Sequence, residues 1–160
     1  MGKADQAWAN ALRAEHFPPE RNYLQAHITL FHHLPPGHWP EIKTRLASLA
    51  HEFPAPDAWL RDVMFLGRGV AYRVECSDLL AMREELAADL QGLLTPQDQA
   101  KPRLHITVQN KVEPAIAKAL FAELSAGFEP RSLEITGFAA HFYRGGPWEP
   151  IQSWKFSGRG

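Results

Sequence analysis

Two stretches of the chain share one pattern, QAHITLF at residues 25–31 and RLHITVQ at residues 103–109. Polar and apolar residues alternate in both, which is typical of a β-strand with one buried face. In each stretch the histidine and the threonine stand two residues apart, so they point the same way from the same face. We therefore expect half-buried strands at 24–34 and 103–112, with matching polar faces.

The rest of the chain is expected to form further helices and strands. Apolar residues recur at helical spacing in some segments and alternate in others, and short Pro/Gly clusters separate them. The expected helices cover residues 5–16 (with Asp5 as N-cap), 39–53, 78–94 and 114–127, and the expected strands cover 58–66, 69–76, 131–143 and 148–156, with a turn at 145–147. This order predicts the α+β class.

The two His-x-Thr stretches belong to a longer internal repeat. Shifting the chain by 78 positions, from His27 to His105, also superimposes the expected helices and one pair of strands. The strand at 69–76 has no counterpart, so the first half lacks an opening strand. Either the chain is truncated, or another element or a second subunit covers that sheet edge. We expect one two-lobed domain over residues 1–160.

Composition restricts the class of protein. The chain has 160 residues, a formal net charge of −1 and 45% hydrophobic residues, ordinary values for one globular domain. A protein that coats duplex nucleic acid usually carries a broad basic surface, so that role is disfavoured. Cys76 is the only cysteine, which excludes an intrachain disulfide and fits a reducing compartment. Without an apolar run of ~20 residues or a secretory signal, we expect a cytoplasmic protein that does not enter membranes.

Two histidines and two threonines on one surface suit phosphodiester chemistry. One imidazole can take a proton from the attacking oxygen, and the other can give a proton to the leaving oxygen. The threonine hydroxyls can donate hydrogen bonds to phosphate oxygens in the transition state. This scheme requires no metal and no other cofactor. A single His-x-Thr on a surface strand would more often have no role, but two on equivalent strands of a repeat favour function.

The sequence resembles the 2H phosphoesterase superfamily, which is defined by two His-x-Thr/Ser motifs, and within it the bacterial 2′-5′ RNA ligase or cyclic phosphodiesterase family. The matching stretches are residues 25–32 and 103–111, and residues 66–72 add a weaker likeness. The resemblance implies an α+β fold of two pseudo-symmetric lobes of antiparallel sheet with flanking helices, facing across a central cleft.

The resemblance also implies an activity. It is the metal-independent opening of 2′,3′-cyclic phosphate ends of RNA or small nucleotides to 2′-phosphates. Joining of ends through a 2′-5′ linkage is the activity that the ligase name records. The residues that carry over as catalytic are His27, Thr29, His105 and Thr107. The implied partners are RNA ends or small cyclic nucleotides, and we expect a monomer.

Four further residues are candidates for substrate binding. Arg103 and Lys111 share the expected face of His105 and could meet a phosphate, although charged residues on such strands are often only solvated. Phe31 and Tyr143 could stack on a base, although packing is the better explanation for an aromatic residue at either position.

Three other functions remain open. A non-catalytic protein that binds RNA ends could keep the fold, although binding alone does not need two titrating groups. A metal-dependent hydrolase could use the histidine-rich segment 27–38, with His32, His33 and His38 beside His27, but no acidic or cysteine ligand accompanies them at a familiar spacing. A structural or interaction module would tolerate the loss of both motif histidines.

Overall fold

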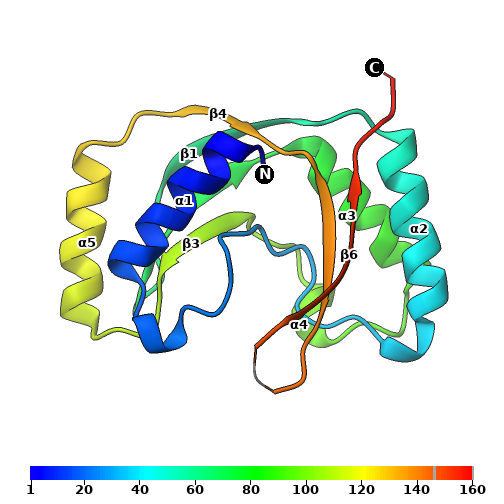
Figure 1. Ribbon diagram of the computed structural model, residues 1–160, viewed down its shortest axis with the longest axis horizontal. Helices are drawn as coiled ribbons and strands as arrows, with labels where there is room; N and C mark the ends of the chain where they lie inside the picture. The colour runs from blue at the N-terminus through cyan, green and yellow to red at the C-terminus, as the bar shows by residue number, and fades with distance from the viewer. Residues whose placement is uncertain (146, 160) are drawn as a thin grey trace.

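Two antiparallel sheets form the framework of the protein, and helices flank both of them (Figure 1). The computed structural model describes residues 1–145 and 147–159. In chain order the elements are α1 (Lys3–His16), the 3-10 turns η1 (Pro19–Arg21) and η2 (Pro36–His38), α2 (Trp39–Glu52), β1 (Asp57–Phe65), β2 (Val70–Glu75), α3 (Ser77–Asp89), α4 (Pro96–Gln99), β3 (His105–Gln109), α5 (Pro114–Ala126), β4 (Arg131–Glu134), β5 (Gly137–Phe142) and β6 (Glu149–Lys155). The α+β class expected from the sequence is confirmed.

The first sheet has the strand order β3-β2-β1-β4, and the second consists of β5 and β6. Helix α1 lies across the first sheet and contacts β3, and α5 contacts β1 and β2 (Figure 1). Helix α2 stands at the opposite end of the molecule and contacts β5, β6 and α3. Amphipathic packing of this kind, with one apolar stripe per helix, buries the core on both sides of the molecule.

The expected strand over 131–143 is in fact two strands in different sheets. β4 ends at Glu134 and pairs with β1, whereas β5 starts at Gly137 and pairs with β6. A Cβ on Gly137 would lie 1.9 Å from the backbone oxygen of Trp154, so only glycine permits this close start of the second sheet. The expected turn at 145–147 includes Gly146, which lies outside the described residues.

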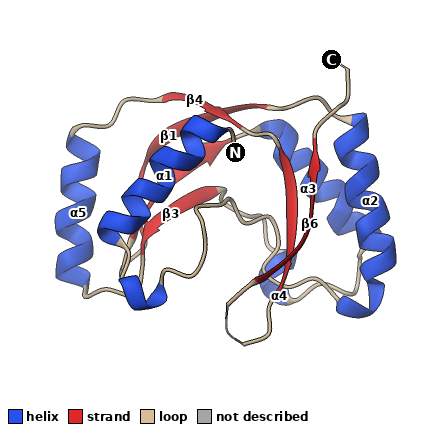
Figure 2. Cartoon of the chain, viewed as in Figure 1, coloured by secondary structure: helices blue, strands red, loops and turns tan. Residues whose placement is uncertain are grey.

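The expected strand over 24–34 does not form. This segment has no ladder and is drawn as a loop beside β3 (Figure 2), with one isolated antiparallel bridge between Ile28 and Ile106. Its alternation correctly indicates extended backbone with one buried face, but alternation does not specify what satisfies the backbone polar groups. The strand expected at 103–112 is shorter, because β3 covers only His105–Gln109.

The expected helices are confirmed as α1, α2, α3 and α5, and the strands at 58–66 and 69–76 are confirmed as β1 and β2. Asp5, however, is not an N-cap, because α1 begins at Lys3. Its carboxylate instead accepts hydrogen bonds from Arg131 Nη1 at 2.6 Å and from the backbone N–H of Glu134 at 2.7 Å, and so ties α1 to β4. Among the described residues, no helix is long and apolar enough to cross a membrane.

Candidate active site

The two His-x-Thr motifs lie side by side. Ile28 and Ile106 form the antiparallel bridge, and Ile106 is fully buried. In an antiparallel pair centred on these residues, His27 lies across from Thr107 and Thr29 lies across from His105. Because side chains alternate along extended backbone and directly opposite residues share a face, these four side chains stand on one face. The structure thus brings the four predicted catalytic residues together.

The two histidine rings are held by the same contact. His27 Nδ1 lies 2.8 Å from the carbonyl oxygen of Gln25, and His105 Nδ1 lies 2.7 Å from that of Arg103. A carbonyl oxygen can only accept, so Nδ1 must carry the hydrogen in both rings. Nε2 is therefore the atom of each ring that can accept or donate a proton in a reaction.

The surroundings of His27 lower its pKa below the ordinary histidine value of 6.5. Partial loss of hydration is the largest cause, because it disfavours the charged imidazolium. The hydrogen bond to Gln25 opposes this effect, and the positive charges of Arg13, His141 and His105 add to it. Neutral His27, with a free lone pair on Nε2, is favoured near pH 7.

The second motif is held by a backbone ladder. Strand β2 pairs with β3, so that Arg73 lies opposite His105 and Ala71 opposite Thr107. The backbone N–H of Val74 donates to the carbonyl of Leu104 at 2.8 Å. On the other edge, buried Arg13 of α1 donates from Nη1 to the Thr107 carbonyl at 2.9 Å.

The first motif is held by side chains instead. On its N-terminal side, Asn10 Oδ1 accepts from the backbone N–H of Ala26, and Gln6 Nε2 donates to the Ala26 carbonyl, both at 2.8 Å. On its C-terminal side, Arg83 of α3 reaches the Leu30 carbonyl at 3.4 Å. Side chains of two helices therefore satisfy backbone groups that a neighbouring strand would satisfy in a sheet.

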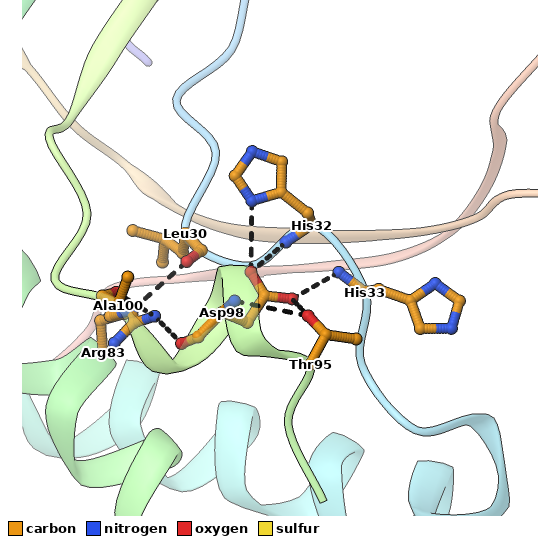
Figure 3. Close-up of polar contacts among 7 residues, drawn as sticks. All are labelled: Leu30, His32, His33, Arg83, Thr95, Asp98 and Ala100. Atoms are coloured by element: carbon orange, nitrogen blue, oxygen red, sulfur yellow. Dashed lines mark hydrogen bonds and ion pairs between the residues drawn. The ribbon is translucent and has the colours of Figure 1, made fainter.

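Asp98 of α4 anchors the chain just after the first motif (Figure 3). Its carboxylate accepts from the backbone N–H groups of His32 and His33, both at 2.8 Å, and lies 3.2 Å from His32 Nδ1. Asp98 is 1% exposed. Burial raises the pKa of its carboxyl, but the bonds from His32 and His33 outweigh burial, so the pKa is lowered and the group stays ionised.

Arg83 completes this anchor. Besides Leu30, its guanidinium donates to the carbonyls of Asp98 and Ala100, the latter at 3.3 Å (Figure 3). The segment that follows the first motif and the segment that precedes the second are thereby fixed to α3. The relative position of the two motifs depends on this buried arginine as well as on the Ile28–Ile106 bridge.

The predicted substrate-binding residues have different surroundings. Phe31 packs against the core, and the Arg83 guanidinium lies 4.6 Å from the centre of its ring. Arg103 is exposed next to His105. Tyr143 is 60% exposed at the end of β5, where its ring centre lies 5.3 Å from that of Trp148. Base stacking by Phe31 and Tyr143 and phosphate contact by Arg103 stay predictions.

The prediction that Lys111 shares the strand face of His105 is wrong, and Gln109 does not lie on that face either. The β2–β3 register shifts between Val70 and Ala71, and this bulge leaves Gln109 buried. Its Oε1 is buried without a hydrogen-bond partner among the described residues. Lys111 lies beyond the end of β3, in a bend with φ of 60°. Its contact with a phosphate stays a prediction, but the shared strand face no longer supports it.

Sequence reasoning missed Arg13, Asp98 and His141 as neighbours of the motifs. Arg13 had only a weak signal, its place four residues after Ala9 on one side of the expected helix, and the burial of both residues is a finding of the structure. Asp98 and His141 had none, because each is placed beside the first motif only by the fold of distant segments.

The histidine-rich segment after the first motif is engaged in other contacts. The backbone N–H groups of His32 and His33 both bind Asp98. Within residues 1–145 and 147–159, no group of three or more His, Cys, Asp or Glu side chains could hold a metal ion. Two surface hollows of about 450 and 420 Å³, along α2 and between α1 and α5, include no motif residue.

Comparison with known proteins identifies the family. The family model for the 2′-5′ RNA ligase superfamily matches residues 2–147, so the chain belongs to that superfamily of 2H phosphoesterases. No curated protein matches the chain.

Solved structures support the fold. The protein TT0787 of Thermus thermophilus is similar with a TM-score of 0.63 and 15% identity, over 100% of this chain and 96% of that one. E. coli LigT, solved with NADP+, is similar with a TM-score of 0.58 and 19% identity, over 98% of this chain and 94% of LigT. The structure of LigT solved with 3′-AMP has a TM-score of 0.54 and 19% identity, over 98% of this chain and 93% of LigT. At these identities the likeness establishes the fold alone.

Proposed function

We propose that the protein is a metal-independent phosphoesterase that opens 2′,3′-cyclic phosphate ends of RNA or nucleotides to 2′-phosphates. The observation that carries the proposal is the matched pair of histidines, each held through Nδ1 by the carbonyl two residues before it. Two Nε2 atoms on one face are what in-line displacement at phosphorus needs, since one proton leaves the nucleophile while another reaches the leaving group. Membership of the superfamily and the nucleotide ligands of solved LigT support it.

We assign His27 as the general base in this proposal, because partial loss of hydration and the nearby charges of Arg13 and His141 favour its neutral form. Neutral His27 takes a proton from water at Nε2 as the water oxygen attacks phosphorus. The bond between phosphorus and the 3′-oxygen breaks, and protonated His105 gives its Nε2 proton to that oxygen. The products are a 2′-phosphate and a free 3′-hydroxyl, and exchange with solvent returns the two rings to their starting states. A 5′-hydroxyl in place of water would give a 2′-5′ linkage.

The remaining residues bind and stabilise. Thr29 and Thr107 hydroxyls donate to the non-bridging phosphate oxygens, where charge accumulates in the transition state. Arg103 attracts the phosphate, and Tyr143 offers an exposed ring to a base.

Hydrolysis of a 2′,3′-cyclic mononucleotide in EDTA tests the proposal, with the product assigned as 2′- or 3′-phosphate. We expect turnover in EDTA with the 2′-phosphate as product. Loss of activity in EDTA would favour a metal-dependent hydrolase. Absence of turnover with both mononucleotides and cyclic-phosphate RNA would favour a protein that only binds RNA ends.

A further inference from the structure

Gln6 and Asn10 stand one turn apart on α1 and form a closed set of hydrogen bonds with Ala26. Gln6 Nε2 donates to the Ala26 carbonyl at 2.8 Å, and the Ala26 N–H donates to Asn10 Oδ1 at 2.8 Å. Gln6 Nε2 also donates to Asn10 Oδ1, at 3.1 Å. Ala26 is 3% exposed, so water does not offer its backbone an alternative.

The donor and acceptor roles in this set are fixed. The Ala26 carbonyl can only accept, so Gln6 must present its NH₂ group. The Ala26 N–H can only donate, so Asn10 must present its oxygen. The bond between the two amides satisfies both requirements at once. Position 6 therefore needs a donor and position 10 needs an acceptor.

The planar peptide group connects Asn10 to the ring of His27. The Ala26 N–H and the Gln25 carbonyl belong to one trans peptide plane and point in opposite directions. Asn10 holds the N–H end of this plane, and the carbonyl end holds His27 Nδ1. The next peptide plane, between Ala26 and His27, is held by Gln6 at its carbonyl end.

We infer that Gln6 and Asn10 are positioning residues for His27, and this inference rests on the proposed function. The second motif shows what they replace. At the equivalent position, 78 residues on, the Leu104 carbonyl accepts from the backbone N–H of Val74 at the same 2.8 Å. A side-chain amide of α1 does for the first motif what strand β2 does for the second.

Two substitutions of equal charge separate positioning from electrostatics. Asn10→Asp keeps an oxygen that accepts hydrogen bonds from the Ala26 N–H and from Gln6. Gln6→Glu replaces the donor NH₂ group with a carboxylate oxygen, which cannot donate to the Ala26 carbonyl. We expect kcat within about threefold of wild type for N10D, but about 10- to 100-fold lower for Q6E, since small misplacements of catalytic groups cost rates of this order. N10L, which removes the acceptor, should resemble Q6E. Ala11→Glu, on the exposed side of α1, is the control for added charge.

The pH profile gives an independent reading. The added negative charge in N10D and Q6E should move the acid arm of kcat/KM upward in both variants, but only Q6E should lose rate at its own optimum. Equal loss in N10D and Q6E, or wild-type kcat in Q6E and N10L, would overturn the inference.

Amide hydrogen exchange tests the contact without substrate. Exchange at Ala26 should be protected in wild type and N10D and faster in N10L, while exchange in β3 stays unchanged. If the wild-type protein turns over no cyclic phosphate, the proposed function fails. Exchange at Ala26 and the NMR signals of the His27 ring, compared between wild type and N10L, still decide whether α1 orients this histidine. Unchanged exchange and ring signals in N10L would refute it.

Discussion

The two motifs have the same sequence pattern and the same histidine contact, but they are supported in different ways. Leu104 and Ala26 occupy equivalent positions before the histidine; the backbone of β2 binds Leu104, and Gln6 binds Ala26. The second motif lies on a strand of a four-stranded sheet. The first is extended backbone with a single bridge, held by Gln6, Asn10, Arg83 and Asp98.

The same arrangement of His and Thr side chains is therefore held in two ways, once by a strand within a sheet and once by extended backbone that side chains bind. A ladder is built from backbone groups, which side-chain substitutions leave in place. Anchors made of side chains can be removed one at a time, so the first motif is the part of the site that mutation can displace without unfolding a sheet.

The largest expected effect is symmetric, because it depends on what the motifs share. His27→Ala and His105→Ala should each lower kcat by about 10²–10⁴-fold, the usual contribution of a general acid or base. Steady-state hydrolysis of a 2′,3′-cyclic nucleotide measures this, with His38→Ala, exposed in η2, as control. Full activity in either motif variant would contradict two-histidine catalysis.

A smaller, asymmetric effect is expected from Asp98→Asn. The amide can accept from only one of the two N–H groups of His32 and His33, and its NH₂ faces the other. Leaving a buried donor unsatisfied costs about 1–3 kcal/mol of unfolding free energy. We expect kcat to fall about tenfold, because the first motif shifts while β3 does not.

Urea unfolding and kcat together check the Asp98 prediction. Asp89→Asn is the matched control, because it makes the same change in an exposed ion pair with Arg45, where a loss below about 1 kcal/mol and no change in rate are expected. Equal effects of the two substitutions would show that Asp98 has no special relation to the first motif.

The sequence was sufficient for the parts of the site that repeat. Local periodicity predicts the two motifs, the four main helices and strands β1 and β2. An element with one buried face has an apolar residue at every second position in a strand, or at every third to fourth position in a helix. The break between β4 and β5 left no such mark, since Leu133, Ile135 and Phe138 are all buried across it.

The supports of the first motif could not be read from the sequence. Asp98 contacts His32 across 66 positions, and Asn10 contacts Ala26 across 16. A polar residue on a helix has many possible partners, and only the fold selects one. The alternation at 24–34 therefore predicts a strand with backbone pairing, whereas in the structure side chains bind backbone groups that pairing would satisfy.

The pH profile sharpens the comparison further. Because the pKa of His27 is lowered, the acid arm of kcat/KM should lie below pH 6.5. In the same range the unfolded chain takes up a proton that folded His27 does not, so the free energy of unfolding should fall as the pH drops. An acid arm above 6.5 would contradict the assignment of His27 as the base.

The smallest effect concerns His141 of β5. Its positive charge helps to lower the pKa of His27, after loss of hydration and the charge of Arg13. His141→Gln removes that charge and keeps a polar side chain, so the acid arm should move upward while kcat at the optimum stays near wild type. His51→Gln, on the exposed side of α2, is the control. A downward shift, or the same shift in both variants, would show that the second sheet does not act on the first motif. The lowered pKa of His27 would then have to come from partial loss of hydration and from Arg13.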